Sequence, residues 1–176
     1  MLLIRGGRVI DPVREVDEIM DVMIEGSQIV ETGKALKVPA DAEVIDAIGL
    51  VVAPGLMDAH VHFRDPGLTY KEDIETGAAA AARGGFTTVV CMANTKPVVD
   101  NLETLSYVQE KGEQTPIHVL QAAAITKGLQ GKELVDMEAL ADAGAAGFTD
   151  DGIPLMDEKL LVQAMEQAKA LGLPLA

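Results

Sequence analysis

Aromatic residues are scarce in this sequence, at 3% of 176 residues with no Trp. A core must therefore be built from Ala, Val, Leu, Ile and Met, which supply most of the 48% hydrophobic content. That content is enough to bury the core of one ordinary domain. Small apolar side chains of this kind favour helices that lie close against a parallel sheet.

The sequence has a single cysteine, Cys91, so it can form no internal disulfide. A reducing cytoplasm is the simplest location for such a protein. The apolar neighbours Val89, Val90 and Met92 predict a buried, unreactive thiol. No apolar run approaches the ~20 residues of a membrane span, and the first residues lack the apolar core of a signal peptide. We therefore expect a cytoplasmic protein that does not contact a membrane.

Basic residues are few, with 14 Lys and Arg against 28 Asp and Glu, which gives a net charge of −14. Binding to nucleic acid needs a basic surface, so the charge argues against it. The acidic excess is best explained as solvated surface.

Residues 1–53 have the pattern of short strands separated by turns. Gly26-Ser27 separates two apolar runs and is typical of a two-residue hairpin loop. We expect a small antiparallel sheet, part of a β-sandwich domain, that is too small to be stable alone.

From residue 54 the pattern changes to alternating strands and helices, with strands expected over 56–63, 87–92, 117–122 and 145–149 and a fifth from 173. Thr69 and Glu72 have the spacing of a capping box for the first helix. These four to five β/α units over 54–176 imply parallel strands with right-handed crossovers. Both half of a (β/α)₈ barrel and an open doubly wound sheet fit the pattern. No glycine-rich dinucleotide loop follows the first strand.

Two histidines alternate at the end of the first of these strands, in His60-Val61-His62. Residues i and i+2 of a strand point to the same face, and imidazole is a common zinc ligand. The alternative is that the histidines simply end a strand. Two of the three histidines fall here, beside Asp58 and Arg64, which favours the metal site.

The ends of the other strands carry further polar groups, in Asn94 and in the pair Asp150 and Asp151. A carboxylate can join two imidazoles around zinc, but both acids also suit a turn before a helix, and Asn94 suits an Asx turn. Arg64 is either a surface or salt-bridge residue or a fork for a substrate carboxylate. His118 lies inside its strand, so we expect it to be packed.

Several motifs together resemble bacterial dihydroorotases of the amidohydrolase superfamily, and they run over nearly the whole chain. They are Pro-Gly-Leu-Met-Asp-Ala-His-Val-His-Phe-Arg-Asp-Pro-Gly (54–67), Gly-Gly-Phe-Thr-Thr (84–88), Met-Ala-Asn-Thr-Lys-Pro (92–97) and Phe-Thr-Asp-Asp-Gly (148–152). The resemblance implies a (β/α)₈ barrel with a small β-domain made from both chain ends. It also implies the reversible, zinc-dependent cyclisation of N-carbamoyl-L-aspartate to L-dihydroorotate in pyrimidine biosynthesis.

Carried over by motif, His60 and His62 would bind zinc, and Asp151 would stand where many relatives have a carboxylated lysine that bridges two ions. One or two zinc ions per site follow from this. Arg64 and Asn94 would hold the carboxylate of the substrate. The family takes two further histidines and its catalytic aspartate from later strands, beyond Ala176. We therefore expect an N-terminal fragment that is inactive alone.

Two other functions stay open. Allantoinases and dihydropyrimidinases are related cyclic amidohydrolases, but a substrate without a ring carboxylate has no use for Arg64, and Asp151 replaces their lysine. The chain could also be a non-catalytic partner that resembles the inactive dihydroorotase-like subunits that scaffold aspartate transcarbamoylase. The missing later ligands argue for that role, and intact His60 and His62 argue against it. A homo-oligomer and an aspartate transcarbamoylase partner are further expectations from the family.

Overall fold

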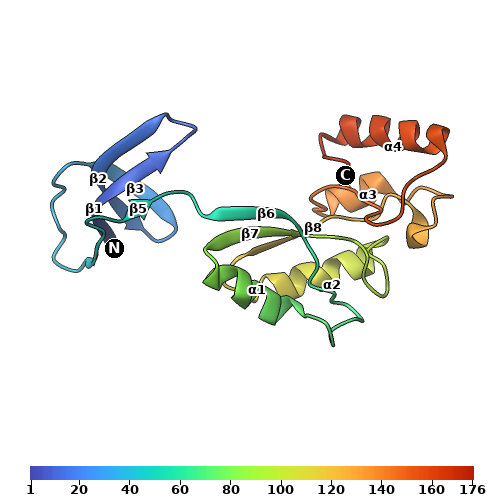
Figure 1. Ribbon diagram of the computed structural model, residues 1–176, viewed down its shortest axis with the longest axis horizontal. Helices are drawn as coiled ribbons and strands as arrows, with labels where there is room; N and C mark the ends of the chain where they lie inside the picture. Colours follow the sequence, from blue (N-terminus) through green and yellow to red (C-terminus); the bar gives the residue numbers. More distant parts are fainter. The chain divides into compact units, whose positions relative to one another are not determined.

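The strands of the protein form two sheets, one in each of two units, Met1–Pro54 and Gly55–Ala176 (Figure 1). The computed structural model describes all residues from 1 to 176. None of its helices has both the length and the apolar character needed to cross a membrane.

The first unit is a five-stranded sheet in the order β3-β2-β1-β4, with β5 also paired to β1. The strands are β1 (Leu2–Asp11), β2 (Val16–Glu25), β3 (Gln28–Gly33), β4 (Glu43–Asp46) and β5 (Val51–Val52). The hairpin predicted at Gly26-Ser27 is confirmed, since Glu25 pairs with Gln28 in the antiparallel pair β2–β3.

The expectation of a purely antiparallel sheet is wrong, because β4 and β5 run parallel to β1. Two hairpins leave β3 running in the same direction as β1, and the connection over residues 34–42 returns the chain to the starting side of the sheet. Buried Asp21 ties this connection down, accepting hydrogen bonds from the backbone N–H of Gly6 (2.8 Å) and of Leu36 (3.0 Å).

The second unit has the predicted alternation of strands and helices, with the parallel order β6-β7-β8. Its elements are β6 (Leu56–Val61), α1 (Ile74–Arg83), β7 (Phe86–Cys91), α2 (Leu102–Gly112), β8 (His118–Gln121), the 3₁₀ turn η1 (Lys127–Leu129), α3 (Met137–Asp142) and α4 (Glu158–Leu171). Figure 1 shows α1 and α2 on one side of this sheet. Parallel strands joined by helices are the pattern expected for an α/β protein.

The strands expected over 145–149 and from 173 are not formed as ladders, which corrects the prediction. Each is reduced to a single parallel bridge, Ala123 with Phe148 and Phe148 with Leu175. Pro174 has no N–H to give to a ladder, although its carbonyl accepts from Phe148 (3.0 Å). The bridges nevertheless continue the parallel order beyond β8. Each successive extended segment lies beside the one that precedes it in the chain.

Small residues let the helices of the second unit approach the sheet closely, as the composition indicates. A Cβ added to Gly77 of α1 would lie 2.5 Å from the ring of Phe63. The core beneath the helices is buried and mostly aliphatic; its largest members are Phe148, Ile74, Leu105, Met137, Leu140, Val89, Val99 and Val108.

The first helix begins later than the capping box predicted. Asp73 is the N-cap of α1, and its carboxylate accepts a hydrogen bond from the N–H of Thr76 (2.8 Å). This bond lowers the pKa of Asp73 below its ordinary value. Thr69 lies outside the helix because the chain there is still in a turn closed by the bond from Lys71 N to Leu68 O (2.9 Å).

Candidate metal centre

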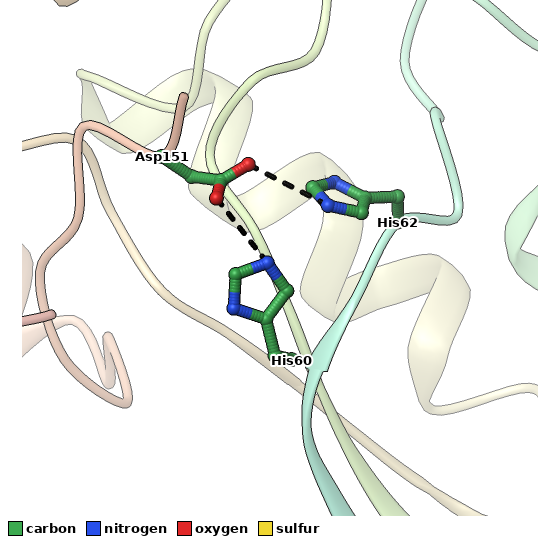
Figure 2. Close-up of side chains that lie close together, drawn as sticks. All are labelled: His60, His62 and Asp151. Carbon is green, nitrogen blue, oxygen red and sulfur yellow. Dashed lines mark ion pairs between the residues drawn. The ribbon is translucent and has the colours of Figure 1, made fainter. Parts of the chain in front are cut away.

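The two alternating histidines reach the same point in space, as Figure 2 shows. His60 lies within β6 and His62 just beyond its last residue. Nε2 of His60 is 3.2 Å from Oδ1 of Asp151, and Nε2 of His62 is 3.5 Å from Oδ2 of the same carboxylate. The predicted convergence of His60, His62 and Asp151 is therefore present in the structure.

Asp151 is delivered to the histidines by a turn that its neighbour holds. Asp150 is buried and accepts hydrogen bonds from the backbone N–H groups of Ile125 (2.8 Å) and Thr126 (3.0 Å), and from the hydroxyl of Thr126. The carbonyl of Asp150 accepts from Ile153 (2.8 Å), which closes the turn around Gly152. The two adjacent acids thus have different roles: Asp150 holds the loop in place, and Asp151 faces the histidines.

Asn94 connects the histidines to the acid. Its Nδ2 donates to Oδ2 of Asp151 over 2.7 Å, and its Oδ1 lies 3.0 Å from Nδ1 of His62. A carboxylate only accepts hydrogen bonds, so the first contact fixes which end of the amide faces His62. The amide oxygen then requires Nδ1 of His62 to carry the proton.

This proton position has an electrostatic consequence for the cluster. In the neutral ring Nε2 of His62 is left with a lone pair, and that lone pair faces an oxygen of Asp151. Two acceptors in this position repel unless a cation lies between them, either a proton or a metal ion. One ligand atom from each of His60, His62 and Asp151 lies within 4.8 Å of the others, so the three residues could hold a metal ion. They are the one such group in the chain.

Arg64 lies beside the cluster and is linked to it through Asn94. Its Nη1 is 3.5 Å from Oδ1 of Asn94, a long hydrogen bond. The backbone of Arg64 is in the left-handed region, with φ of 61°. A non-glycine residue there is held by its surroundings, so the loop fixes the direction in which the side chain of Arg64 leaves the backbone.

Asp65, which follows Arg64 in the chain, has the most buried carboxylate of the ion pairs in the second unit. Its side chain is fully buried and accepts from the hydroxyl of Tyr107 (2.9 Å) and from Nζ of Lys111 (2.8 Å). The hydrogen bond to Asp65 raises the pKa of Lys111 above its ordinary value, with a smaller contribution from Tyr107. No local signal predicts these partners, since they lie 42 and 46 residues along the chain.

Two other sequence predictions have clear outcomes. Cys91 is buried as predicted, and burial raises the pKa of its thiol to about 12. His118 is exposed at the start of β8, so the expectation of a packed histidine is wrong. The side chains of β8 alternate between the two faces of the sheet, and Val119, not His118, faces Gly112 of α2.

An open hollow of about 620 Å³ adjoins the cluster and could admit a small molecule. His60, Asp150 and Asp151 line it, together with Ile125 and the segment from Gly152 to Leu155. A larger hollow of about 910 Å³ lies at the opposite ends of the strands, beside Thr87 and His118, and holds no group of metal-ligating residues.

Comparison with known proteins now places these residues in a family. Residues 49–176 match the model of a family described as Dihydro-orotase-like. The chain belongs to this family. The matched range contains all five of the residues that the sequence motifs single out: His60, His62, Arg64, Asn94 and Asp151.

Curated relatives extend the similarity of this dihydro-orotase-like chain to its first strands. It is 61% identical over 176 residues to a dihydroorotase of Clostridioides difficile (strain 630) and 54% identical over 176 residues to a dihydroorotase of Clostridium acetobutylicum. Each match covers 100% of this chain and 42% of the relative. The dihydro-orotase-like chain therefore spans less than half the length of these proteins.

Solved structures show the same fold. A D-hydantoinase (dihydropyrimidinase) from Thermus sp. is 28% identical with a TM-score of 0.77, and the match covers 99% of this chain and 39% of that one. An L-hydantoinase (dihydropyrimidinase) from Arthrobacter aurescens has a TM-score of 0.84 at 22% identity, with the same coverage. At 22% identity the second likeness concerns the fold alone.

Proposed function

We propose that this chain is part of a zinc-dependent dihydroorotase, which interconverts N-carbamoyl-L-aspartate and L-dihydroorotate in pyrimidine biosynthesis. The observation that carries the proposal is the meeting of His60, His62 and Asp151 beside Arg64 and Asn94. The 61% identity to a named dihydroorotase over the whole chain supports the same reaction.

The donor set suits zinc. Two imidazole nitrogens and a carboxylate oxygen are ligands that zinc accepts, and the facing acceptors of His62 and Asp151 call for a cation. When bound, zinc lowers the pKa of its water towards ~7 and polarises a carbonyl group. One ion, or two bridged by Asp151, would be held here, with His60 and His62 as ligands of the first.

The residues of this chain bind and orient the substrate. The guanidinium of Arg64 offers paired donors that match a carboxylate, and the amide of Asn94 adds one more donor. Asn94 also holds the proton on Nδ1 of His62, which leaves Nε2 free as a ligand. The carboxylate of the substrate would then lie beside Arg64 and Asn94.

The proposal extends to the architecture and the surroundings of the protein. Residues 1–53 would belong to a small β-sandwich domain, and 54–176 to the first four to five β/α units of a (β/α)₈ barrel whose remaining units supply the general base. The single-bridge continuation past β8 supports this order. The partners would be the small-molecule substrate, further copies of the protein and an aspartate transcarbamoylase, in the cytoplasm.

A second candidate, the hydrolysis of cyclic ureides such as dihydropyrimidines or hydantoins, is favoured by the structural likeness to the D-hydantoinase from Thermus sp.. Substrates of that kind have no ring carboxylate for Arg64. The position of Arg64 beside Asn94 therefore favours dihydroorotate.

Comparing substrates tests the proposal. The protein in its full natural length, loaded with zinc, is assayed with L-dihydroorotate and with dihydrouracil, which lacks the carboxylate. We expect turnover of dihydroorotate with a kcat/KM about ten- to two-hundredfold higher, as the loss of a charge-assisted pair implies. Preference for dihydrouracil would establish the second candidate, and turnover of neither would favour a scaffold role.

A further inference from the structure

An ion pair with a buried carboxylate joins the loop that carries Arg64 to helix α2. The side chain of Asp65 is 0% exposed, and each of its carboxylate oxygens accepts one hydrogen bond, Oδ1 from Tyr107 and Oδ2 from Lys111. A buried carboxylate is costly unless it is paired in this way. Tyr107 and Lys111 are themselves partly exposed, so two surface side chains reach inward to a buried carboxylate.

The same loop is pressed against the loop that carries Asn94. Lys96 donates its backbone N–H to the carbonyl of Pro66 (3.0 Å). A Cβ added to Gly67 would lie 1.7 Å from the carbonyl oxygen of Lys96, so only glycine fits there. Leu68 donates to the carbonyl of Arg64 (2.9 Å), which closes the turn.

These contacts surround a residue in an unfavourable conformation. Arg64 has φ of 61°, which for a non-glycine residue persists only where neighbouring contacts determine it. Asp65 follows Arg64 directly, so the contacts of its carboxylate limit how far the backbone of Arg64 can rotate.

We propose that Asp65, Tyr107 and Lys111 form a brace that positions Arg64 for the carboxylate of the substrate; the proposal rests on the function proposed above. None of the three residues touches the metal cluster in the structure. They are positioning residues, and they act through the backbone of Arg64. Tyr107 and Lys111 lie one turn apart on α2 and hold the two oxygens of Asp65 from the same side.

The variant Lys111→Met tests the brace. It leaves the buried carboxylate of Asp65 without its charged partner, so its fold is first compared with that of Tyr107→Phe, which keeps the ion pair. Arg64 grips the carboxylate in the ground state and in the transition state alike, so its misplacement raises KM more than it lowers kcat. We expect KM for dihydroorotate to rise about ten- to a hundredfold. Tyr107→Phe should act in the same direction, and Lys111→Arg should restore much of the loss.

The matched control is Lys127→Met, which removes another lysine ion pair, that of Lys127 with Glu133, away from Arg64. We expect it to leave KM and kcat unchanged. The decisive comparison is made in an Arg64→Met background, where Lys111→Met should have no further effect on KM. An equal rise of KM in both backgrounds would show that Lys111 acts on the fold and not through Arg64, which overturns the proposal.

A readout without substrate separates failure of the brace from failure of the proposed function. Backbone amide exchange of Leu68 and Lys96 reports the two hydrogen bonds that enclose the turn. Lys111→Met should speed exchange at both amides about tenfold relative to Lys127→Met. Unchanged exchange would refute the brace even if the enzyme turns over dihydroorotate. Faster exchange in a protein with no such activity would support the brace and refute the proposed function.

Discussion

Nδ2 of Asn94 donates a hydrogen bond of 2.7 Å to Oδ2 of Asp151, although the two residues are 57 positions apart. The same amide accepts from Nδ1 of His62. The resemblance assigns Asn94 to the substrate, whereas in the structure it contacts two members of the cluster as well as Arg64. Outer partners of this kind orient metal ligands and fix the tautomer of a histidine.

We therefore expect Asn94→Ala to weaken metal binding as well as catalysis. Zinc affinity, measured by competition with a chelator, should fall about 10- to 100-fold. Thr95→Ala is the control, because the hydroxyl of Thr95 bonds the carbonyl of Pro97 and not the cluster. Unchanged zinc affinity in Asn94→Ala would assign the residue to the substrate alone.

Arg64→Met removes the proposed carboxylate fork. The change should cost about 1.5–3 kcal/mol of binding to a charged group, seen as a fall in kcat/KM of about ten- to two-hundredfold. Zinc content should stay the same, since Arg64 contacts Asn94 but no member of the cluster. Arg83→Met, at the exposed end of α1, serves as the control. A kcat/KM equal to that of the control would rule out the fork.

Asp150→Ala should destabilise the second unit without removing a member of the cluster. It leaves two buried N–H groups, those of Ile125 and Thr126, without an acceptor, at about 1–3 kcal/mol each. Chemical denaturation should show a loss of several kcal/mol, against little change in Asp142→Ala, where the replaced side chain is exposed. Equal stability of the two variants would contradict the structural role of Asp150.

The buried thiol of Cys91 makes stability depend on pH in the alkaline range. Its pKa is raised from 9.0 to about 12 by burial. The folded state therefore keeps the proton that the unfolded chain loses, so this contribution is complete below pH 9 and is lost as pH rises towards 12.

Between pH 9 and 11 the unfolding free energy should fall by about 1.4 kcal/mol per pH unit more in the natural protein than in Cys91→Ala. Denaturation curves of the two proteins at several pH values measure the difference. Parallel pH profiles would show that the thiol ionises equally in both states.

Much of this architecture could be predicted from the sequence, because the strongest patterns in the sequence are local. Strand-helix alternation, the Gly26-Ser27 hairpin and the burial of Cys91 all follow from residues close together in the chain. His60 and His62 were predictable for the same reason, since alternation in a strand fixes their common face. Asp151 could be added only because strand ends of a parallel sheet meet at one edge.

What the sequence did not predict depends on partners that are distant in the chain. Asp65 has the sequence context of a turn residue, and only the fold brings Lys111 of α2 to its carboxylate. Nothing in the sequence distinguishes Asp150 from Asp151; in the structure Asp150 alone accepts hydrogen bonds from Ile125 and Thr126. The cap of α1 is Asp73 and not the predicted Thr69, because the residues around Thr69 form a turn that precedes the helix. The direction of β4 was set by the connection after β3, which has no strong pattern.

The most direct test of the central claim, that His60, His62 and Asp151 hold one metal site, is the zinc content of purified variants after dialysis. The natural protein should retain at least one equivalent of zinc, and His60→Ala should lose it, while His118→Ala, which removes the exposed histidine outside the cluster, should retain it. Zinc retained by His60→Ala at the level of His118→Ala would contradict the assignment.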